Sequence, residues 1–386
     1  MSVFSFSEAH DLLRRELRKF AQKEIVPGAR EEPRPDRTVR DLVRKVGDAG
    51  YLGVNIPAKY GGMTAEWVDW VSWGITMEEL ARADPVLGLA FLMPMIANQL
   101  LAKSSEETKQ QWLTPIIRGQ KLTCFALTEP ECGSDAAAIK MRAVKDKDYY
   151  ILTGEKTAIT LGMYADVAIV FAKTDMSRGL KGTSCFLVPL DLPGIARSPF
   201  SDMGLRAAGR ASITMDDVRI PAKYLLGEEG RGFYMAMEQF DFMRIGLGLA
   251  ALAQAQTALE ETMDYAKQRI AFGQPLARFE AVSFKIAEAA TLIEAGRCLC
   301  YHSFSLIDQG LSHTKEAAMC KWWCPRTAAE IVHNCLLIFG HIGYSDEHSI
   351  SQRLRDVIAF EIADGTADIM KIIISRELMG REFRPY

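Results

Sequence analysis

The sequence lacks most of the short motifs that mark common enzyme classes. It contains no GxxxxGKS or GxxxxGKT phosphate loop, no GxSxG elbow around a nucleophilic serine and no HExxH pair of metal-binding histidines. The nearest approach to the dinucleotide motif GxGxxG is Gly246-Leu-Gly248, inside an apolar run typical of a helix. A Rossmann-type cofactor, serine hydrolase chemistry and a metal cofactor are therefore not predicted.

Net charge and long apolar runs are also scarce. The 46 Lys and Arg residues nearly balance the 49 Asp and Glu residues, leaving a formal charge of -3, so no strong field attracts nucleic acid or an acidic membrane. No run approaches the roughly 18 apolar residues of a membrane span, and the first residues do not resemble a secretory signal. We expect a cytoplasmic protein without membrane insertion and without a nucleic-acid partner.

The eight cysteines form no CxxC pair. Cys320 and Cys324 would lie one turn apart on an apolar helix. Because cysteine is among the residues most often buried, we predict reduced thiols inside the core.

Length and composition predict two or three globular domains, since 48% of the 386 residues are hydrophobic and 25% are charged. The patterning changes twice along the chain. We predict a helical domain at residues 1–121, a β domain at 122–230 and a second helical domain at 231–386.

Helical spacing dominates the first and last domains. Ser7 can cap a helix that carries apolar residues up to Ile25 and ends before Pro27, and Val39 to Val46 follow a 3.6-residue rhythm. Further helices are predicted at 66–83, 88–102, 106–117, 234–268, 279–309, 313–339 and 368–380.

The middle domain has the composition and spacing typical of β-strands. Short runs such as ADVAIVFAKTD and GTSCFLVPL are rich in β-branched and aromatic residues and are bounded by Gly, Pro and Asp. No helical segment alternates with them. This pattern favours an antiparallel barrel or sandwich over a doubly wound parallel sheet.

Two polar segments could carry chemistry. The loop ALTEPECGSDAA (126–137) could offer hydroxyls and glycine amides to a phosphate or a flavin, or could be an ordinary polar loop. The stretch EIADGTADIM (361–370) breaks two helical runs at Asp364 and Gly365. Taken alone, Asp-Gly is most often a turn, so this stretch by itself predicts no site.

Several motifs taken together resemble the acyl-CoA dehydrogenase family. ALTEPECGSD, LTGEKTAIT, MDDVRIP, LLGEEGRGF, KQRIAFGQPL, FGHIGY and ADGTADI occur in the family's order and spacing over essentially the whole chain. The resemblance implies an α+β, mainly α, fold with an N-terminal helical domain, a middle antiparallel β-barrel domain and a C-terminal four-helix bundle. It also implies a homotetramer, a dimer of dimers, that binds FAD between domains and between subunits.

The resemblance assigns the FAD contacts residue by residue. Contacts with the flavin and its pyrophosphate are implied for Phe125, Leu127, Thr128, Gly133 and Ser134, with Ala158, Ile159 and Thr160 along the isoalloxazine. Contacts with the FAD of the adjacent subunit are implied for Arg269, Phe272, Glu280, Leu337, Gly340, His341, Thr366 and Asp368. An arginine suits a pyrophosphate because its planar fork donates two parallel charged hydrogen bonds.

Asp364 stands where most of the family has the glutamate that takes the α-proton of the thioester. Some members place this glutamate at the position that is Met243 here, so no second carboxylate competes for the role. The remaining substrate contacts implied are Ser134, Asp241, Met243, Arg244, Gly365 and Arg376. Burial would have to raise the Asp364 pKa from about 3.9 for efficient base catalysis.

The chain departs from the family at several of these positions. Aspartate is shorter than glutamate by one C–C bond, roughly 1.5 Å, while Ala363 replaces a common Tyr and Ala158 a common Trp. Glu280, Leu337 and His341 also differ from the common residues at the inter-subunit FAD contact. We hypothesise a bulky acyl group, branched or cyclic at Cα, as in cyclohexane-1-carboxyl-CoA, the substrate type of the alicyclic branch.

The segment DPVLGLAFLMPMIAN (84–98), which lines the acyl pocket in relatives, is uncharged after Asp84. This apolar composition disfavours a polar acyl tail. An apolar helix can equally well serve only to pack the hydrophobic core. The expected electron acceptor is an electron-transfer flavoprotein. Two alternatives stay open: a flavin oxidase of a small non-CoA substrate such as a nitroalkane, which also uses an aspartate base, and a catalytically idle FAD-binding scaffold.

Overall fold

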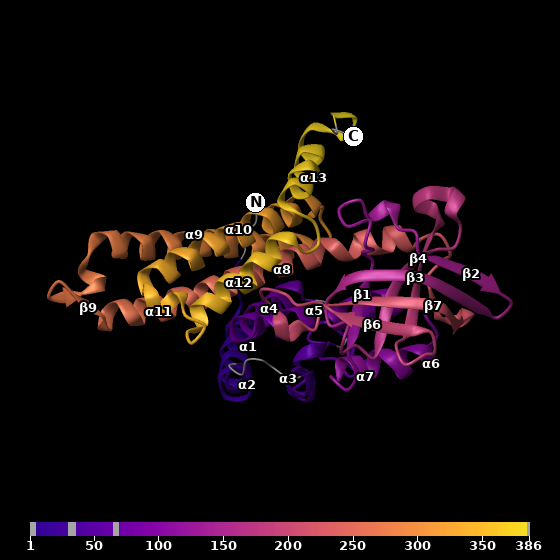
Figure 1. The fold of residues 1–386 in the computed structure, drawn as a ribbon, viewed down its shortest axis with the longest axis horizontal. Coiled ribbons are helices and arrows are strands. Elements are labelled where there is room, and N and C mark those ends of the chain that lie inside the picture. The colour runs from indigo at the N-terminus through magenta and orange to yellow at the C-terminus, as the bar shows by residue number, and fades with distance from the viewer. Residues whose placement is uncertain (1–4, 30–35, 65–68, 384–386) are drawn as a thin grey trace.

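The computed structural model describes residues 5–29, 36–64 and 69–383. Helices of the first third pack beneath a long helical bundle, and the sheet lies at one end of the molecule (Figure 1). The mainly helical fold class with a central sheet is confirmed. The N-terminal helices are α1 (Glu8–Phe20), α2 (Val26–Ala29), α3 (Asp36–Asp48), α4 (Trp70–Ala83), α5 (Pro85–Leu101), α6 (Glu106–Thr108) and α7 (Thr114–Ile117).

The first helix begins as predicted and ends differently. The Ser7 side chain accepts a hydrogen bond from the His10 N–H, and the His10 ring accepts one from the Ser7 N–H, which closes a capping box. The predicted end before Pro27 was wrong, because a π-turn at Ala21–Ile25 leads directly into α2. Pro27 lies in the first turn of α2, where the missing N–H costs little. The predicted start of the next helix at residue 66 lies outside the described residues.

The middle region forms one sheet in the order β6-β7-β3-β2-β4-β5-β8. Its strands are β1 (Thr123–Ala126), β2 (Arg142–Asp146), β3 (Tyr149–Ile159), β4 (Val167–Lys173), β5 (Thr183–Pro189), β6 (Ile195–Pro199), β7 (Ala211–Pro221) and β8 (Leu225–Leu226). Both β4 and β5 are buried on both faces, which explains the apolar runs VAIVFA and CFLVP within them.

The prediction of a purely antiparallel sheet was wrong for β4, which pairs in parallel with β1 and, at one residue, with β2. A long connection makes a parallel pair possible, and β2 and β3 lie in the connection between β1 and β4. The remaining ladders of this sheet are antiparallel.

The last third is helical. It contains α8 (Gly232–Gln268), a small hairpin of β9 (Ile270–Ala271) and β10 (Gln274–Pro275), α9 (Glu280–Asp308), α10 (Thr314–Phe339), α11 (His341–Tyr344), α12 (Ser349–Ile362) and α13 (Ala367–Met379). Helix α8 packs against α4, α9, α10 and α12, and α10 also packs against α13. The shared core lies along α8, whose residues 242–255 are buried.

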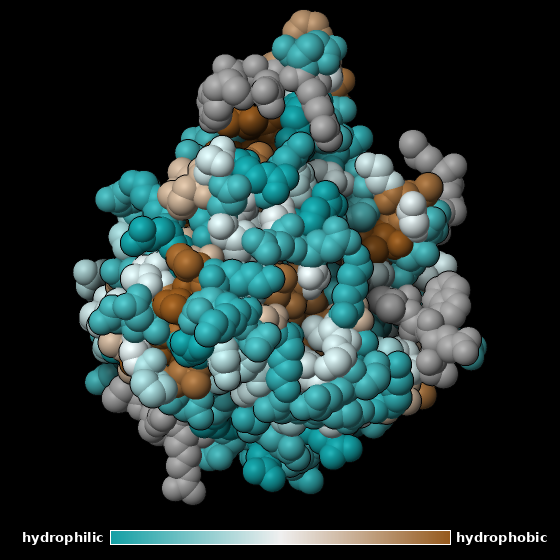
Figure 2. Space-filling view, turned by 90° about the vertical axis from the view of Figure 1, so that its right-hand side faces the viewer, coloured by the Kyte–Doolittle hydropathy of each residue, from teal (hydrophilic) through white to brown (hydrophobic). Residues whose placement is uncertain are grey.

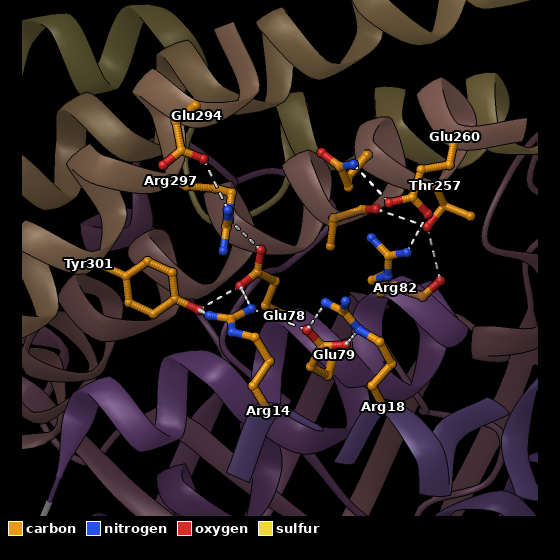
Figure 3. A network of polar contacts seen from close by, with 12 residues as sticks. Arg14, Arg18, Glu78, Glu79, Arg82, Thr257, Glu260, Glu294, Arg297 and Tyr301 are labelled. Atoms are coloured by element: carbon orange, nitrogen blue, oxygen red, sulfur yellow. Dashed lines mark hydrogen bonds and ion pairs between the residues drawn. The ribbon is translucent and has the colours of Figure 1, made fainter. Parts of the chain in front are cut away.

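A buried ionic network joins the first helices to the last domain (Figure 3). Glu78 on α4 accepts hydrogen bonds from Arg14 on α1 at 2.6 Å and from Arg297 on α9 at 2.7 Å. The Tyr301 hydroxyl donates to the same carboxylate at 2.6 Å. Burial by itself raises the pKa of Glu78, yet the charges of Arg14 and Arg297 hold that pKa below its ordinary value. The network therefore clamps α1 and α4 onto α9 with an ionised carboxylate at its centre.

The sheet end of the molecule presents mostly hydrophilic residues, with hydrophobic ones in small separate groups (Figure 2). Within the described ranges, no helix has both the length and the apolar character needed to cross a membrane. The eight cysteines are reduced and seven are buried, as predicted, but Cys298 is exposed, contrary to the prediction. The Cys300 and Cys324 sulfurs lie 3.9 Å apart.

Candidate active site

Asp364 lies in a tight turn between α12 and α13. Its φ is +55° and that of Gly365 is +108°, so two successive residues have positive φ. Aspartate tolerates this backbone better than most side chains, and glycine tolerates it freely. A Cβ on Gly365 would lie 2.6 Å from the end of the Met370 side chain. The Asp-Gly break is thus a real turn whose shape depends on both residues.

Two buried cations hold the main chain of this turn. Arg244 on α8 donates from Nε to the Asp364 carbonyl at 3.3 Å. Lys321 on α10 donates from Nζ to the Gly365 carbonyl at 3.1 Å and to the Glu361 carbonyl at 3.4 Å. The turn is therefore fixed from two sides by helices of the bundle core.

The electrostatics of Asp364 follow from these neighbours. Burial raises the pKa of the Asp364 carboxyl above its ordinary value, while Lys321 and Arg244 act in the opposite direction. Within the described part of the chain, the Asp364 N–H donates no hydrogen bond. The turn thus combines a carboxylate with increased basicity and a free main-chain donor beside it.

Aromatic contacts connect this turn to the sheet. The Arg244 guanidinium carbon lies 5.1 Å from the centre of the Phe240 ring. Phe240 in turn meets Phe125 on β1 edge to face, with 6.0 Å between ring centres. Phe125 immediately precedes the polar loop that follows β1. The predicted base and the predicted flavin loop therefore belong to one region of the structure.

A buried ion pair sets the shape of that loop. The Glu129 carboxylate accepts the N–H groups of Lys140 at 2.6 Å and Met141 at 3.0 Å, as well as the Lys156 ammonium at 2.7 Å. Lys156 is fully buried and also donates to the Leu127 carbonyl at 2.9 Å. Lys156 ties the start of the loop to β3, and Glu129 ties that start to the main chain just after the loop, which leaves the tip free to meet a ligand.

The tip has the donors that a phosphate or flavin requires. Gly133 and Ser134 are exposed, and in the described structure neither their N–H groups nor the Ser134 hydroxyl has a partner. The Thr128 side chain is likewise unpaired among the described residues and partly exposed. The chemistry of this donor set fits the predicted FAD.

The other predicted flavin contacts on the sheet differ in what they can offer. Leu127 and Ile159 are buried, so only their main chains can reach a ligand. Ala158 has a φ of +58° and lies at a register shift between β3 and β7, which turns the chain before the partly exposed Thr160. The small side chain of Ala158 leaves this bulge open.

The second predicted FAD set lies elsewhere. Arg269 and Phe272 belong to the β9–β10 hairpin, which lies at the opposite end of the long axis from the sheet (Figure 1). Phe272 is 97% exposed. The rest of this exposed set is Glu280 at the start of α9 and Leu337, Gly340 and His341 around the α10–α11 junction. Thr366 and Asp368 do not join it, because they flank the start of α13 beside Asp364. One chain alone cannot place both sets on one FAD.

The remaining predicted substrate contacts surround Arg244. The Asp241 carboxylate accepts from Arg244 at 3.5 Å and from the Thr314 hydroxyl at 2.6 Å. Met243 is buried. Arg376 on α13 is half-buried and pairs with Glu377 at 3.0 Å. Arg244 itself donates to the main chain of the turn, which gives it a holding role, and its contact with CoA stays a prediction.

Lys321 was missed by the sequence reasoning, although a signal for it exists. It stands in the apolar run AAMCKWWC, between the buried Cys320 and Cys324. Across the described residues, no group of His, Cys, Asp and Glu side chains could hold a metal ion.

Comparisons with known proteins identify all three regions. The family models for the N-terminal, middle and C-terminal domains of acyl-CoA dehydrogenase match residues 7–120, 124–218 and 230–379. The chain is 37% identical over 377 residues to a 3-(aryl)acrylate reductase of Clostridium sporogenes, covering 97% of this chain and 99% of the relative.

Further relatives extend the comparison. The mouse mitochondrial short-chain specific acyl-CoA dehydrogenase is 37% identical over 98% of this chain and 91% of its own length. The caffeyl-CoA reductase-Etf complex subunit CarC of Acetobacterium woodii is 37% identical over 97% of this chain and its full length. The structure superposes on a Geobacillus kaustophilus acyl-CoA dehydrogenase with a TM-score of 0.89, 35% identity and coverage of 98% and 100%.

Proposed function

The chain belongs to the acyl-CoA dehydrogenase family of FAD-dependent oxidoreductases, and from this premise we propose that it removes hydrogen from Cα and Cβ of an acyl-CoA thioester with Asp364 as the base. The observation that carries the proposal is the turn itself. It presents a carboxylate of raised pKa beside an unpartnered N–H, with Arg244 and Lys321 holding its main chain.

Different residues of the chain would carry out different parts of this reaction. The Asp364 carboxylate takes the proton from Cα, and the electron pair of that C–H bond forms the new double bond as hydride leaves Cβ. The Asp364 N–H is available to the thioester oxygen, where negative charge develops, as in an oxyanion hole. FAD, when bound, supplies the hydride acceptor, and the donors of Thr128, Gly133 and Ser134 would hold it.

Gly365 is needed for this geometry. Replacing it with Ala adds a methyl group at a φ of +108° and against Met370, at a cost of about 1–3 kcal/mol of stability. A displacement of the neighbouring base by about 1 Å would slow the proton transfer roughly a hundredfold. We expect Gly365→Ala to show both losses, measured by thermal unfolding and by the anaerobic rate of flavin bleaching with acyl-CoA.

Gly310 provides a matched control, because it also has positive φ, +66°, but a Cβ there meets no atom within 4 Å. Gly310→Ala should lower stability without slowing bleaching. Equal bleaching rates in the two variants would remove the turn from the proposed mechanism.

The substrate proposal is a bulky acyl group, cyclic or branched at Cα, such as cyclohexane-1-carboxyl-CoA. Three small or short residues support it: Ala363 and Asp364 at the turn, and Ala158 at a position that the family resemblance places along the isoalloxazine. A larger group at Cα would carry the α-proton toward the shorter base. Two relatives are named for ring-bearing compounds, aryl acrylate and caffeyl-CoA, which supports room for a ring but places that ring on Cβ, whereas the short-chain relative supports a smaller acyl group.

A substrate panel tests it. Under anaerobic conditions, cyclohexane-1-carboxyl-CoA should bleach the bound flavin faster than butyryl-CoA or octanoyl-CoA, because only the ring substrate fills the space that the two alanines leave. Equal or faster bleaching with the straight chains would rule out the ring preference. Oxygen consumption with a nitroalkane would favour the oxidase alternative, and absence of bleaching by any acyl-CoA would favour an idle scaffold.

The proposed assembly is a homotetramer with an electron-transfer flavoprotein as acceptor. The separation of the two FAD sets supports sharing of each FAD between subunits, and the Phe272 ring, 97% exposed in one chain, would be covered at such an interface. An apolar groove of about 570 Å³ between α9, α10 and α13 adds further uncovered surface, lined among others by Leu299, Trp322, Trp323, Ile374 and Leu378. A relative named as part of an Etf complex supports the acceptor.

A further inference from the structure

Lys321 is unusual among the buried residues of the bundle. Its side chain is completely buried on α10, and its ammonium group donates to two main-chain carbonyls, those of Glu361 and Gly365. Burying a charge is costly unless the group is well paired. The charged ammonium group of Lys321 is therefore hydrogen-bonded to two neutral carbonyl groups, one before and one after Asp364 in the chain.

These two hydrogen bonds hold the two ends of the turn together. The Glu361 carbonyl belongs to the last turn of α12, and the Gly365 carbonyl directly precedes the first residues of α13. Asp364 has positive φ, a conformation that persists only when its surroundings enforce it. The hydrogen bonds from Lys321, together with the one from Arg244 to the Asp364 carbonyl, hold Asp364 in this conformation.

Charged groups reach this turn from each helix packed around it. Helix α8 contributes Arg244 and its partner Asp241, α10 contributes Lys321, α12 contributes Glu361, and α13 contributes Arg376, which acts on Arg244. Of these, Lys321 and Arg244 act directly on Asp364, and both favour its ionised form. Arg244 forms an ion pair with Asp241 at 3.5 Å, whereas Glu361 acts on Lys321 without an ion pair among the described residues.

We propose that Lys321 is a positioning residue for the proposed base, which fixes the 361–365 turn and keeps the Asp364 carboxylate ionised through its positive charge. The inference rests on the function proposed above. Burial lowers the pKa of Lys321 to about 8, while Asp364 opposes that shift, so the lysine is charged at neutral pH. Without that charge, burial would raise the pKa of Asp364 further, and less of the base would be ionised near neutrality.

The test is the pH profile of anaerobic flavin bleaching in the full-length, FAD-loaded protein. Lys321→Met removes the charge and both hydrogen bonds, Lys321→Gln keeps a neutral donor, and Lys321→Arg keeps the charge. The acid limb of the profile should move to higher pH by about one unit in Lys321→Met and Lys321→Gln. At pH values below the acid limb, a shift of this size lowers the bleaching rate about tenfold relative to the wild type. At high pH the bleaching rate of Lys321→Gln should approach that of the wild type.

The remaining variants define the outcomes. Lys321→Arg should keep the acid limb in place, and Lys315→Met, a change at a more exposed lysine of the same helix, should have no effect. FAD content from visible absorbance and the hydrogen exchange of amides 361–366 give readouts besides activity, and exchange should rise in Lys321→Met. An unmoved limb in both neutral variants, or failure of all three Lys321 variants to fold, would overturn the inference and leave Lys321 a purely structural residue. If the wild type itself is not bleached, the proposed function fails instead.

Discussion

Asp364→Asn should retain FAD and bind acyl-CoA but lose anaerobic flavin bleaching. The amide has nearly the shape of the carboxylate, so the turn, its two positive φ angles and the bonds from Arg244 and Lys321 should survive. Only the ability to take a proton is removed, and a positioned general base contributes about 10²–10⁴-fold to rate. Stopped-flow absorbance of the bound flavin measures this loss directly.

Its control is Glu361→Gln, three residues earlier in the same segment. Glu361 contributes its main-chain carbonyl to Lys321, and that contact does not need the carboxylate. The Gln variant should keep most of the bleaching rate. Native bleaching in Asp364→Asn, or loss of bleaching only in Glu361→Gln, would show that the base is not Asp364.

Glu78→Ala is expected to destabilise the protein strongly. It leaves Arg14 and Arg297 without the carboxylate that both bind, and breaking a buried ion pair in this way costs about 3–5 kcal/mol. At about 2.1 cal/mol/K per residue over this length, the melting temperature should fall by roughly 4–6 °C. Differential scanning calorimetry checks the shift.

The matched control is Glu294→Ala, which removes the other carboxylate bound to Arg297. Glu294 is 66% exposed, and such pairs contribute about 0–1 kcal/mol. A similar loss in both variants would mean that burial of Glu78 adds nothing to the clamp.

The clamp also predicts a pH dependence. Because the folded-state pKa of Glu78 is lowered, its contribution is complete above the unfolded value of about 4.3 and is lost as the pH falls through the lower folded value. The stability gap between wild type and Glu78→Ala should therefore be constant at neutral pH and narrow only in acid.

Sequence reasoning succeeded where structure depends on near neighbours. The Ser7 cap and the Asp364-Gly365 break are decided within a few residues, and the texture of the strands depends on their own composition. Sequence reasoning failed where the structure depends on packing between segments that are far apart in the chain. A lysine in a helix is usually solvated, and Lys321 is buried only because α10 packs against α8, α9, α12 and α13.

The same limit explains the other corrections. The parallel pairing of β1 with β4 depends on where the chain re-enters the sheet, which no local pattern records. A different case is the hairpin of Arg269 and Phe272, for which the resemblance predicted contact with the FAD of an adjacent subunit. The fold places this hairpin at the far end of the molecule from the polar loop after β1 (Figure 1), and the contact itself stays a prediction.

That separation has a genetic meaning. If each FAD site takes its base from one subunit and its Arg269 contact from another, two differently damaged alleles can complement each other. In a mixed pair of an Asp364-deficient chain and an Arg269-deficient chain, one site collects both defects and the other collects neither. Half of the sites in such a pair would be intact, although each parent chain alone would build none.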